Sequence, residues 1–260
     1  MRTLLLTLLL APMMSFGQNV DIPDANFKSY LVNNTAINTN GDSEIQVSEA
    51  STYTGNNIYG IDCPLQNISD LTGIEAFTAL TRLVCWGNNL TSLDVSNNTA
   101  LTLLDCGENQ LASLDVSSNT ALTYLICGIN NLTSLDVSNN TALTTLVSVG
   151  NNSLNCLNLK SGNNTTLISV EITPHPSLYC IEVDNVTYST NAWFISPWAS
   201  FSENCNNDCS SSLDITELNN TPKQLIKIVD LLGREAPFKP NTTLLYIYDD
   251  GTVERKMIIE

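Results

Sequence analysis

The sequence predicts an α/β solenoid in which short parallel strands stack along one axis. Three consecutive segments carry this prediction, because they repeat one pattern of leucines, asparagines and small apolar residues every 21 or 22 residues. Such a period is typical of solenoids, since one turn cannot bury its own apolar face without a neighbour. The segments are LTSLDVSNNTALTLLDCGENQ (90–110), LASLDVSSNTALTYLICGINN (111–131) and LTSLDVSNNTALTTLVSVGNNS (132–153).

Looser copies extend the repeat over residues 58–183. Within one turn, Leu122, Leu125 and Cys127 take inward positions, and Asn130 follows the strand, where its amide can bond to neighbouring turns. The LxxLxLxxN spacing resembles the leucine-rich-repeat family, with a short period nearer to internalin-like bacterial surface proteins than to the ribonuclease-inhibitor type. The resemblance implies one stacked strand in the LxxLxC half of each turn and a ligand-binding surface beside it.

Eight cysteines fall into two groups. Four recur at one inward repeat position and predict a column of buried free thiols, because metal ligands would have to converge on one point. They are Cys63, Cys85, Cys106 and Cys127, with Ser148 on the next rung. The other four, Cys156, Cys180, Cys205 and Cys209, lie outside the regular units. We expect a Cys180–Cys205 disulfide to close the last turn, with Cys156–Cys180 as the alternative.

The outward residues of the predicted strands form the candidate ligand face. They are apolar for an exposed surface and include an aromatic residue in two rungs, a composition that often marks interaction sites. Cover by flanking loops is the alternative. The candidates are Arg82, Val84, Trp86, Leu103, Asp105, Tyr124, Ile126, Thr145 and Val147.

A helical cap is expected over residues 18–57, with a helix at 24–33. The segment NTNGDSEIQVSE (38–49) resembles an EF-hand or dockerin calcium loop, although Ser43 stands where that family has glycine. A polar turn without metal is the alternative. The resemblance implies that calcium is held by the side chains of Asn38, Asn40, Asp42 and Glu49 and by the backbone carbonyl of Glu44.

A column of acidic side chains also follows the repeat. Asp94, Asp115 and Asp136 recur in the phrase LDVS, and Asn158 takes the following rung. Such a column either collects cations or bonds to nearby hydroxyls and turn amides. The second interpretation is favoured, because aspartate commonly makes these local bonds in turns.

Both ends of the chain are expected to direct export. Residues 1–17 have the charged start and leucine-rich stretch of a signal peptide, and no later segment is apolar enough to span a membrane. After a C-terminal cap and linker at 184–212, the β-rich tail at 213–260 resembles type IX secretion sorting domains through KIVDLLGRE (227–235) and LYIYDDGTVERK (245–256). The resemblance implies outer-membrane secretion machinery as a partner and a secreted or outer-surface location in a Gram-negative bacterium. An ordinary small β-domain is the alternative.

Charge and motifs narrow the function. The net charge is −16, and residues 18–212 hold three basic against eighteen acidic residues, which disfavours nucleic-acid and anionic-membrane binding. His175 is the only histidine, and HExxH, GxSxG and glycine-rich phosphate motifs are absent from the sequence. We therefore predict a non-catalytic adhesion protein that binds a protein or a glycan. The alternatives are a polysaccharide hydrolase with a carboxylate pair and a structural spacer.

Overall fold

The computed structural model describes residues 18–55, 60–162, 164–205 and 209, together with three strands near the C-terminus. The expected signal peptide at 1–17 lies outside these residues. The chain divides into two compact units, 1–211 and 212–260, close to the expected start of the tail. Within the described residues, no helix is long and apolar enough to cross a membrane.

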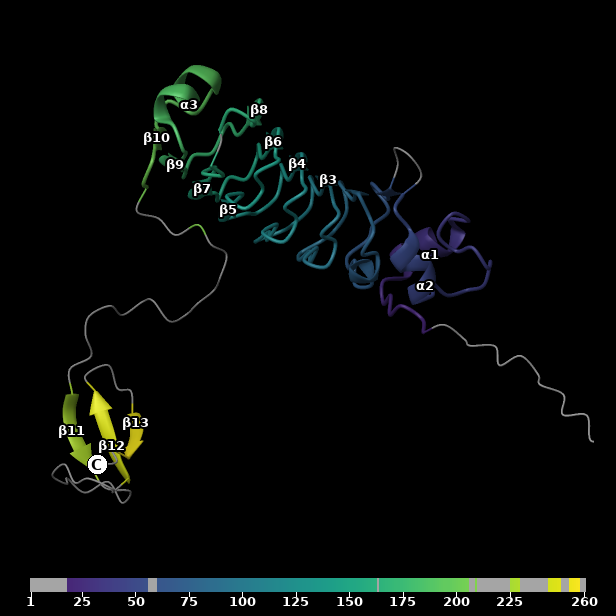
Figure 1. Ribbon diagram of the computed structural model, residues 1–260, viewed down its shortest axis with the longest axis horizontal. Helices are drawn as coiled ribbons and strands as arrows, with labels where there is room; N and C mark the ends of the chain where they lie inside the picture. Colours follow the sequence, from purple (N-terminus) through teal and green to yellow (C-terminus); the bar gives the residue numbers. More distant parts are fainter. Residues whose placement is uncertain are drawn as a thin grey trace, which may run out of the picture. The chain divides into compact units, whose positions relative to one another are not determined.

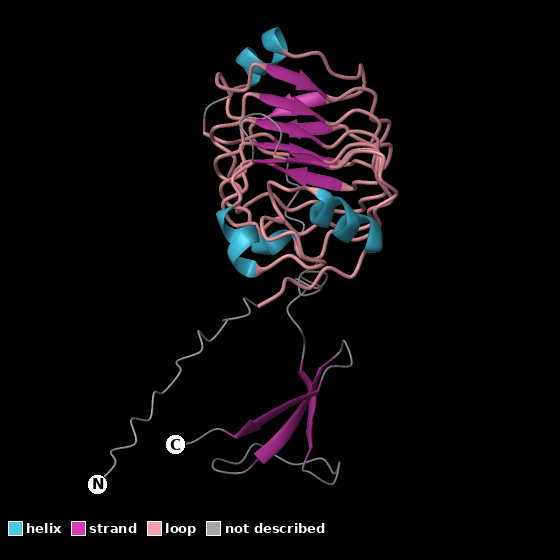
Figure 2. Cartoon of the chain, turned by 90° about the vertical axis from the view of Figure 1, so that its right-hand side faces the viewer, coloured by secondary structure: helices cyan, strands magenta, loops and turns pink. Residues whose placement is uncertain are grey.

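Parallel strands stack in the first unit, as the repeat predicts (Figures 1 and 2). Each strand pairs with the equivalent strand of the next turn, so that Leu83, Leu104, Leu125 and Leu146 lie in register and are fully buried. The predicted solenoid fold is thereby confirmed. Its main sheet contains β1 (Ile61–Asp62), β2 (Arg82–Val84), β3 (Leu103–Asp105), β4 (Tyr124–Ile126), β6 (Thr145–Val147) and β8 (Ser169–Glu171).

A second parallel sheet forms from the LDVS half of the later turns, where the sequence analysis placed no strand. Leu135, Leu157 and Ile181 are buried in this sheet and occupy the same rung position. The solenoid core is therefore closed by strands on two sides near its C-terminal end. This sheet has the order β5 (Ser134–Asp136), β7 (Cys156–Asn158), β9 (Cys180–Glu182) and β10 (Ser200–Ser202).

Buried asparagines tie successive turns together. The Nδ2 of Asn130 donates to the carbonyl oxygens of Cys106 and Cys127 at 3.0 and 3.2 Å, and its Oδ1 accepts from the backbone N–H of Leu111 at 2.9 Å. Asn88, Asn109 and Asn151 make the equivalent bonds on their own rungs. A second buried column, not singled out in the sequence, consists of Asn98, Asn119 and Asn140.

Helices cover the N-terminal end of the stack. Helix α1 (Ala25–Asn33) matches the expected helix, and α2 (Val47–Thr52) follows the polar loop. Asp24 caps α1 through Oδ1, while its Oδ2 accepts from the N–H and hydroxyl of Ser69. One carboxylate thus joins the cap to the first repeat, where the short 3-10 helix η1 (Ile74–Ala76) lies.

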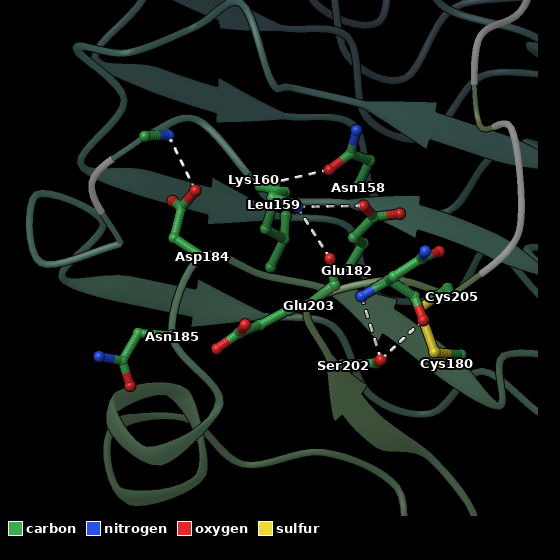
Figure 3. A network of polar contacts seen from close by, with 12 residues as sticks. Asn158, Leu159, Lys160, Cys180, Glu182, Asp184, Asn185, Ser202, Glu203 and Cys205 are labelled. Atoms are coloured by element: carbon green, nitrogen blue, oxygen red, sulfur yellow. Dashed lines mark hydrogen bonds and ion pairs between the residues drawn. A yellow bond between two sulfur atoms is a disulfide. The ribbon is translucent and has the colours of Figure 1, made fainter.

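Two disulfides and helix α3 (Val186–Ala192) close the other end. Figure 1 shows the helix, and Figure 3 shows the Cys180–Cys205 disulfide. Cys180 pairs with Cys205, with their Cα atoms 5.8 Å apart, which is the pairing favoured from the sequence. The alternative Cys156–Cys180 bridge is wrong, because Cys156 pairs with Cys209 at a Cα separation of 5.4 Å. Cys156 and Cys180 are adjacent on β7 and β9, and each bonds to the segment after β10 instead of to the other.

Polar contacts reinforce this closure around the second sheet (Figure 3). Lys160 Nζ donates to the carbonyl oxygen of Glu203 at 2.8 Å and lies 3.7 Å from a carboxylate oxygen of Glu182.

The tail unit, described by itself, is an antiparallel sheet of β11 (Leu225–Val229), β12 (Thr243–Tyr248) and β13 (Val253–Met257).

Candidate binding face

The outward residues of the main sheet form two columns along the solenoid, which we call the six-stranded face. Strand register places Arg82, Leu103, Tyr124 and Thr145 in one column. Val84, Asp105, Ile126 and Val147 form the other column, and Trp86 follows β2. The structure therefore brings the nine predicted ligand-face residues together on one surface.

Val84 is the exception to the predicted exposure. Its side chain is only 7% exposed, although it occupies an outward position between Asp62 and Asp105 on the neighbouring strands. The expectation that Val84 is exposed on this face is therefore wrong. Sequence alternation identifies the direction of a side chain but not the height of its neighbours.

An apolar depression of about 290 Å³ lies where the strands end. Outward residues of three strands contribute to it, and two glycines from the turns form part of its lining. Four of the predicted face residues meet there, so the depression concentrates part of the predicted surface. It is lined by Trp86, Asp105, Gly107, Glu108, Ile126, Gly128, Ile129, Val147 and Val149.

A second depression of about 450 Å³, which we call the threonine-lined depression, lies at the opposite ends of the same strands. Tyr124, with 46% of its surface exposed, is the aromatic residue there. Thr102 and Thr123 donate their hydroxyls to the carbonyl oxygen of the threonine one turn earlier, at 3.0 and 2.9 Å. The lining consists of Gly55, Gly60, Thr81, Arg82, Thr102, Leu103, Thr123 and Tyr124, while Thr145 lines neither depression.

Two glycines in the lining of the apolar depression allow adjacent turns to approach closely. A Cβ atom on Gly128 would lie 2.9 Å from the carbonyl oxygen of Val149, and one on Gly107 would lie 3.3 Å from the carbonyl oxygen of Gly128. A side chain at Gly128 would therefore require the adjacent turn to shift, and one at Gly107 would require a smaller adjustment.

Sequence reasoning missed Glu108 and Ile129 as part of this site. Both have left-handed backbones, with φ of 51° and 54°, at a turn position that Gly87 and Gly150 occupy in other rungs. Left-handed backbone is uncommon for non-glycine residues and an outlier for a β-branched one. The signal was present in the sequence: two repeats place glycine where these two repeats place a large side chain.

The two charged residues in the lining of the apolar depression, Asp105 and Glu108, are both acidic. Asp105 is half-buried and accepts from the backbone N–H of Gly107 at 3.2 Å. Burial raises the pKa of Asp105, the Gly107 bond and the Arg82 charge oppose that rise, and the charges of Asp62 and Glu108 add to it. Among the described residues the ion pairs are Lys28–Glu44 and Lys160–Glu182, so neither Asp105 nor Glu108 has one.

The expected calcium loop is held by its own hydrogen bonds. Oε1 of Glu49 accepts from the backbone N–H groups of Thr39 and Asn40, and both Asp42 oxygens accept from groups within the loop. The Nδ2 of Asn38 donates to the carbonyl oxygen of Asp42 at 2.8 Å. The described residues contain no cluster of three or more acidic, histidine or cysteine ligands. Calcium binding stays a prediction.

The acidic column makes the turn bonds that the sequence favoured. Asp94, Asp115 and Asp136 each accept from the backbone N–H of the serine two residues later, at 2.8 to 2.9 Å. The Ser96 hydroxyl and backbone N–H bonds lower the pKa of Asp94. His175 is buried, and its Nδ1 lies 2.9 Å from the carbonyl oxygen of Asn151, away from the six-stranded face.

Part of this chain is similar to known proteins in sequence and in structure. No family model matches the chain. A stretch of 76 residues is 38% identical to Internalin J of Listeria monocytogenes serotype 4b (strain F2365), covering 29% of this chain and 8% of the relative. The solved functional domain of InlJ from Listeria monocytogenes, which includes a cysteine ladder, matches with a TM-score of 0.51 and 35% identity. The fold is an internalin-like leucine-rich-repeat solenoid.

The leucine-rich-repeat match is partial in length. It covers 64% of this chain and 38% of the solved InlJ chain. The buried free thiols of Cys63, Cys85, Cys106 and Cys127 form a corresponding column in the present solenoid. This chain and the solved InlJ domain therefore share the repeat architecture. The chain spans less than half the length of either relative.

Proposed function

We propose that this leucine-rich-repeat solenoid is a non-catalytic interaction module whose six-stranded face binds a protein ligand. The apolar depression carries the proposal, because the half-buried side chains of Trp86, Ile126 and Val147 line one accessible hollow on an acidic chain. Accessible apolar clusters of this kind often mark interaction sites. Repeat proteins also use their extended faces for binding.

The open shape of the depression, more than its volume, favours a protein ligand. Sites for small molecules enclose about 300 to 1,000 Å³ and bury most of the ligand. The apolar depression, at about 290 Å³, is open and suits one or two side chains from a larger surface. Aromatic residues such as Trp86 commonly anchor such interfaces. The secreted or outer-surface location and the adhesion role rest on the sequence resemblances.

Alanine variants test the face. We expect Trp86→Ala to weaken capture of a protein ligand from a protein and glycan array by about tenfold or more, as for an interface anchor. Tyr124→Ala tests the threonine-lined depression. Tyr179→Ala is the matched control, since this tyrosine is 63% exposed but lies outside both depressions. Unchanged capture by Trp86→Ala and Tyr124→Ala with intact circular dichroism would contradict the proposal.

The same array separates the alternatives. Capture of glycans that depends on Tyr124 alone would favour a glycan-binding face. For the hydrolase alternative, Asp105 and Glu108 are the candidate carboxylate pair, since both line one depression. Release of sugars from polysaccharide that stops in Asp105→Asn would favour that activity over binding.

A further inference from the structure

The apolar depression combines two features that suit one kind of partner group. Its walls are the apolar side chains of Trp86, Ile126 and Ile129, and two carboxylates, Asp105 and Glu108, lie among them. A purely apolar anchor would leave the carboxylates in a less hydrated position without a counterion. A group with an apolar stem and a positive end would satisfy both features.

The carboxylates lack a full countercharge. Arg82 is the basic residue whose charge acts on Asp105, but Asp62 and Glu108 oppose it. Within the described part of the chain, neither Asp105 nor Glu108 is in an ion pair. A half-buried carboxylate gains from an incoming cation, because charge complementarity is strengthened when water is displaced.

Backbone conformation is a separate observation at the same place. Ile129 holds a left-handed backbone, φ 54°, and is 55% exposed. The equivalent residues Gly87 and Gly150 show that glycine satisfies this turn. A β-branched residue is strained there, and strain concentrates at functional sites. The fold therefore tolerates strain where it presents an apolar side chain to the depression.

We propose that the depression receives a basic side chain, lysine or arginine, of a protein partner. The methylene stem packs on Trp86 and Ile126, and the cationic group lies at Asp105 and Glu108. Lysine and arginine commonly bury their stems on apolar surface while the charged end stays polar, and cations are attracted to a tryptophan ring. This inference rests on the proposed function, and it names the chemistry of the partner.

Capped tripeptides provide the test. The full chain, labelled with ¹⁵N, is titrated with leucine–lysine–leucine and with matched peptides that carry arginine, norleucine or glutamate at the centre. We expect the lysine or arginine peptide to shift the amides of Gly107 and Gly128 and the indole of Trp86. Norleucine keeps the stem without the charge, so its peptide should bind about threefold to fivefold more weakly, as for a partly exposed ion pair.

Charge variants complete the design. Glu108 is exposed, so Glu108→Gln should leave the melting temperature unchanged. The variant should remove the preference for the lysine peptide over the norleucine peptide. Asp105→Asn should do the same, and Asp115→Asn is the control, since Asp115 is an exposed carboxylate that bonds to its own turn. Equal binding of the lysine and norleucine peptides, or a preference that survives both variants, would overturn the inference.

The two proposals fail in different ways. If array capture depends on Trp86 but the peptides show no charge preference, only the basic side chain is excluded. If capture ignores Trp86 and Tyr124, the proposed function itself is wrong. Peptide shifts elsewhere on the solenoid, outside Gly107, Gly128 and Trp86, would also overturn the inference.

Discussion

Single asparagine side chains connect successive turns, in addition to the backbone hydrogen bonds between their strands. The side chain of Asn130 bonds to the carbonyl oxygens of Cys106, Cys127 and Gly128 and to the N–H of Leu111, at distances of 2.9 to 3.3 Å. Buried backbone groups without partners cost about 1 to 3 kcal/mol each. The column therefore stabilises the stack at positions where the backbone leaves the strand and needs other partners.

Asn130→Ala should lower the free energy of unfolding by about 2 to 4 kcal/mol, because it leaves buried backbone groups unsatisfied. Urea unfolding followed by circular dichroism measures this change. Asn131→Ala is the matched control, since Asn131 is adjacent and exposed. An equal loss in both variants would mean that the buried bonds of Asn130 contribute nothing specific.

The thiol column predicts a pH dependence. Burial raises the pKa of Cys63 and Cys127 to about 12 and that of Cys85 and Cys106 well above 9. Below pH 9 both folded and unfolded thiols keep their protons. Above pH 9 the unfolded thiols ionise while the folded ones do not, so stability is lost as pH rises from 9 toward 12.

We expect a loss of about 1 kcal/mol per thiol at pH 10 relative to pH 8, since one pKa unit corresponds to about 1.4 kcal/mol. Urea midpoints at the two pH values measure it. Cys127→Ala removes one titrating group and should show a smaller decrease. The same decrease in variant and parent would assign the pH effect to other groups.

At the scale of elements, the loop between α1 and α2 shows how one polar pattern fits two interpretations. Glu49 caps the loop with Oε1 and accepts from the N–H of Gln46 with Oε2 at 3.0 Å. Burial acts to raise the pKa of Glu49. Hydrogen bonds from Gln46 and Thr39 outweigh this effect, so the pKa is lowered. The carboxylate is thus charged and ordered, as either a cap or a ligand requires.

Calcium titration decides between these roles. If the loop binds calcium, calorimetry of the full chain should show saturable heat with a dissociation constant near 10⁻⁴ to 10⁻³ M, the range of weak extracellular sites. Glu49→Gln should abolish the heat, and Glu75→Gln, outside the loop, should not. Heat that is absent in the parent, or equal in parent and Glu49→Gln, would leave the loop as a hydrogen-bonded turn.

The whole molecule consists of two units with different roles in our interpretation. The solenoid unit carries the binding face, and the small antiparallel unit contains the segments that resemble sorting domains. Three antiparallel strands are consistent with the β-rich tail expected from sequence, but they are also what any small β-domain would show. The sorting role stays a prediction.

Comparing the export of a shortened chain with that of the full chain tests the sorting role directly. A chain ending at Ser212 should remain inside the outer membrane of a Gram-negative host with type IX secretion, while the full chain reaches the medium or the surface. Fractionation and immunoblotting detect the difference. Normal export of the shortened chain would remove the sorting function, and failure of both chains to leave the inner membrane would instead implicate residues 1–17.

The sequence by itself determined the solenoid, because a strict period of leucines, cysteines and asparagines is required wherever identical turns bury one another. It also determined which residues face outward on the main sheet. Only the tertiary structure decided which of them are accessible, since Val84 is shielded while Ile129 and Glu108 project from left-handed turns. The disulfide partners of Cys156 and Cys209 likewise depend on where the chain returns after β10, because bridges require proximity in space and not in sequence.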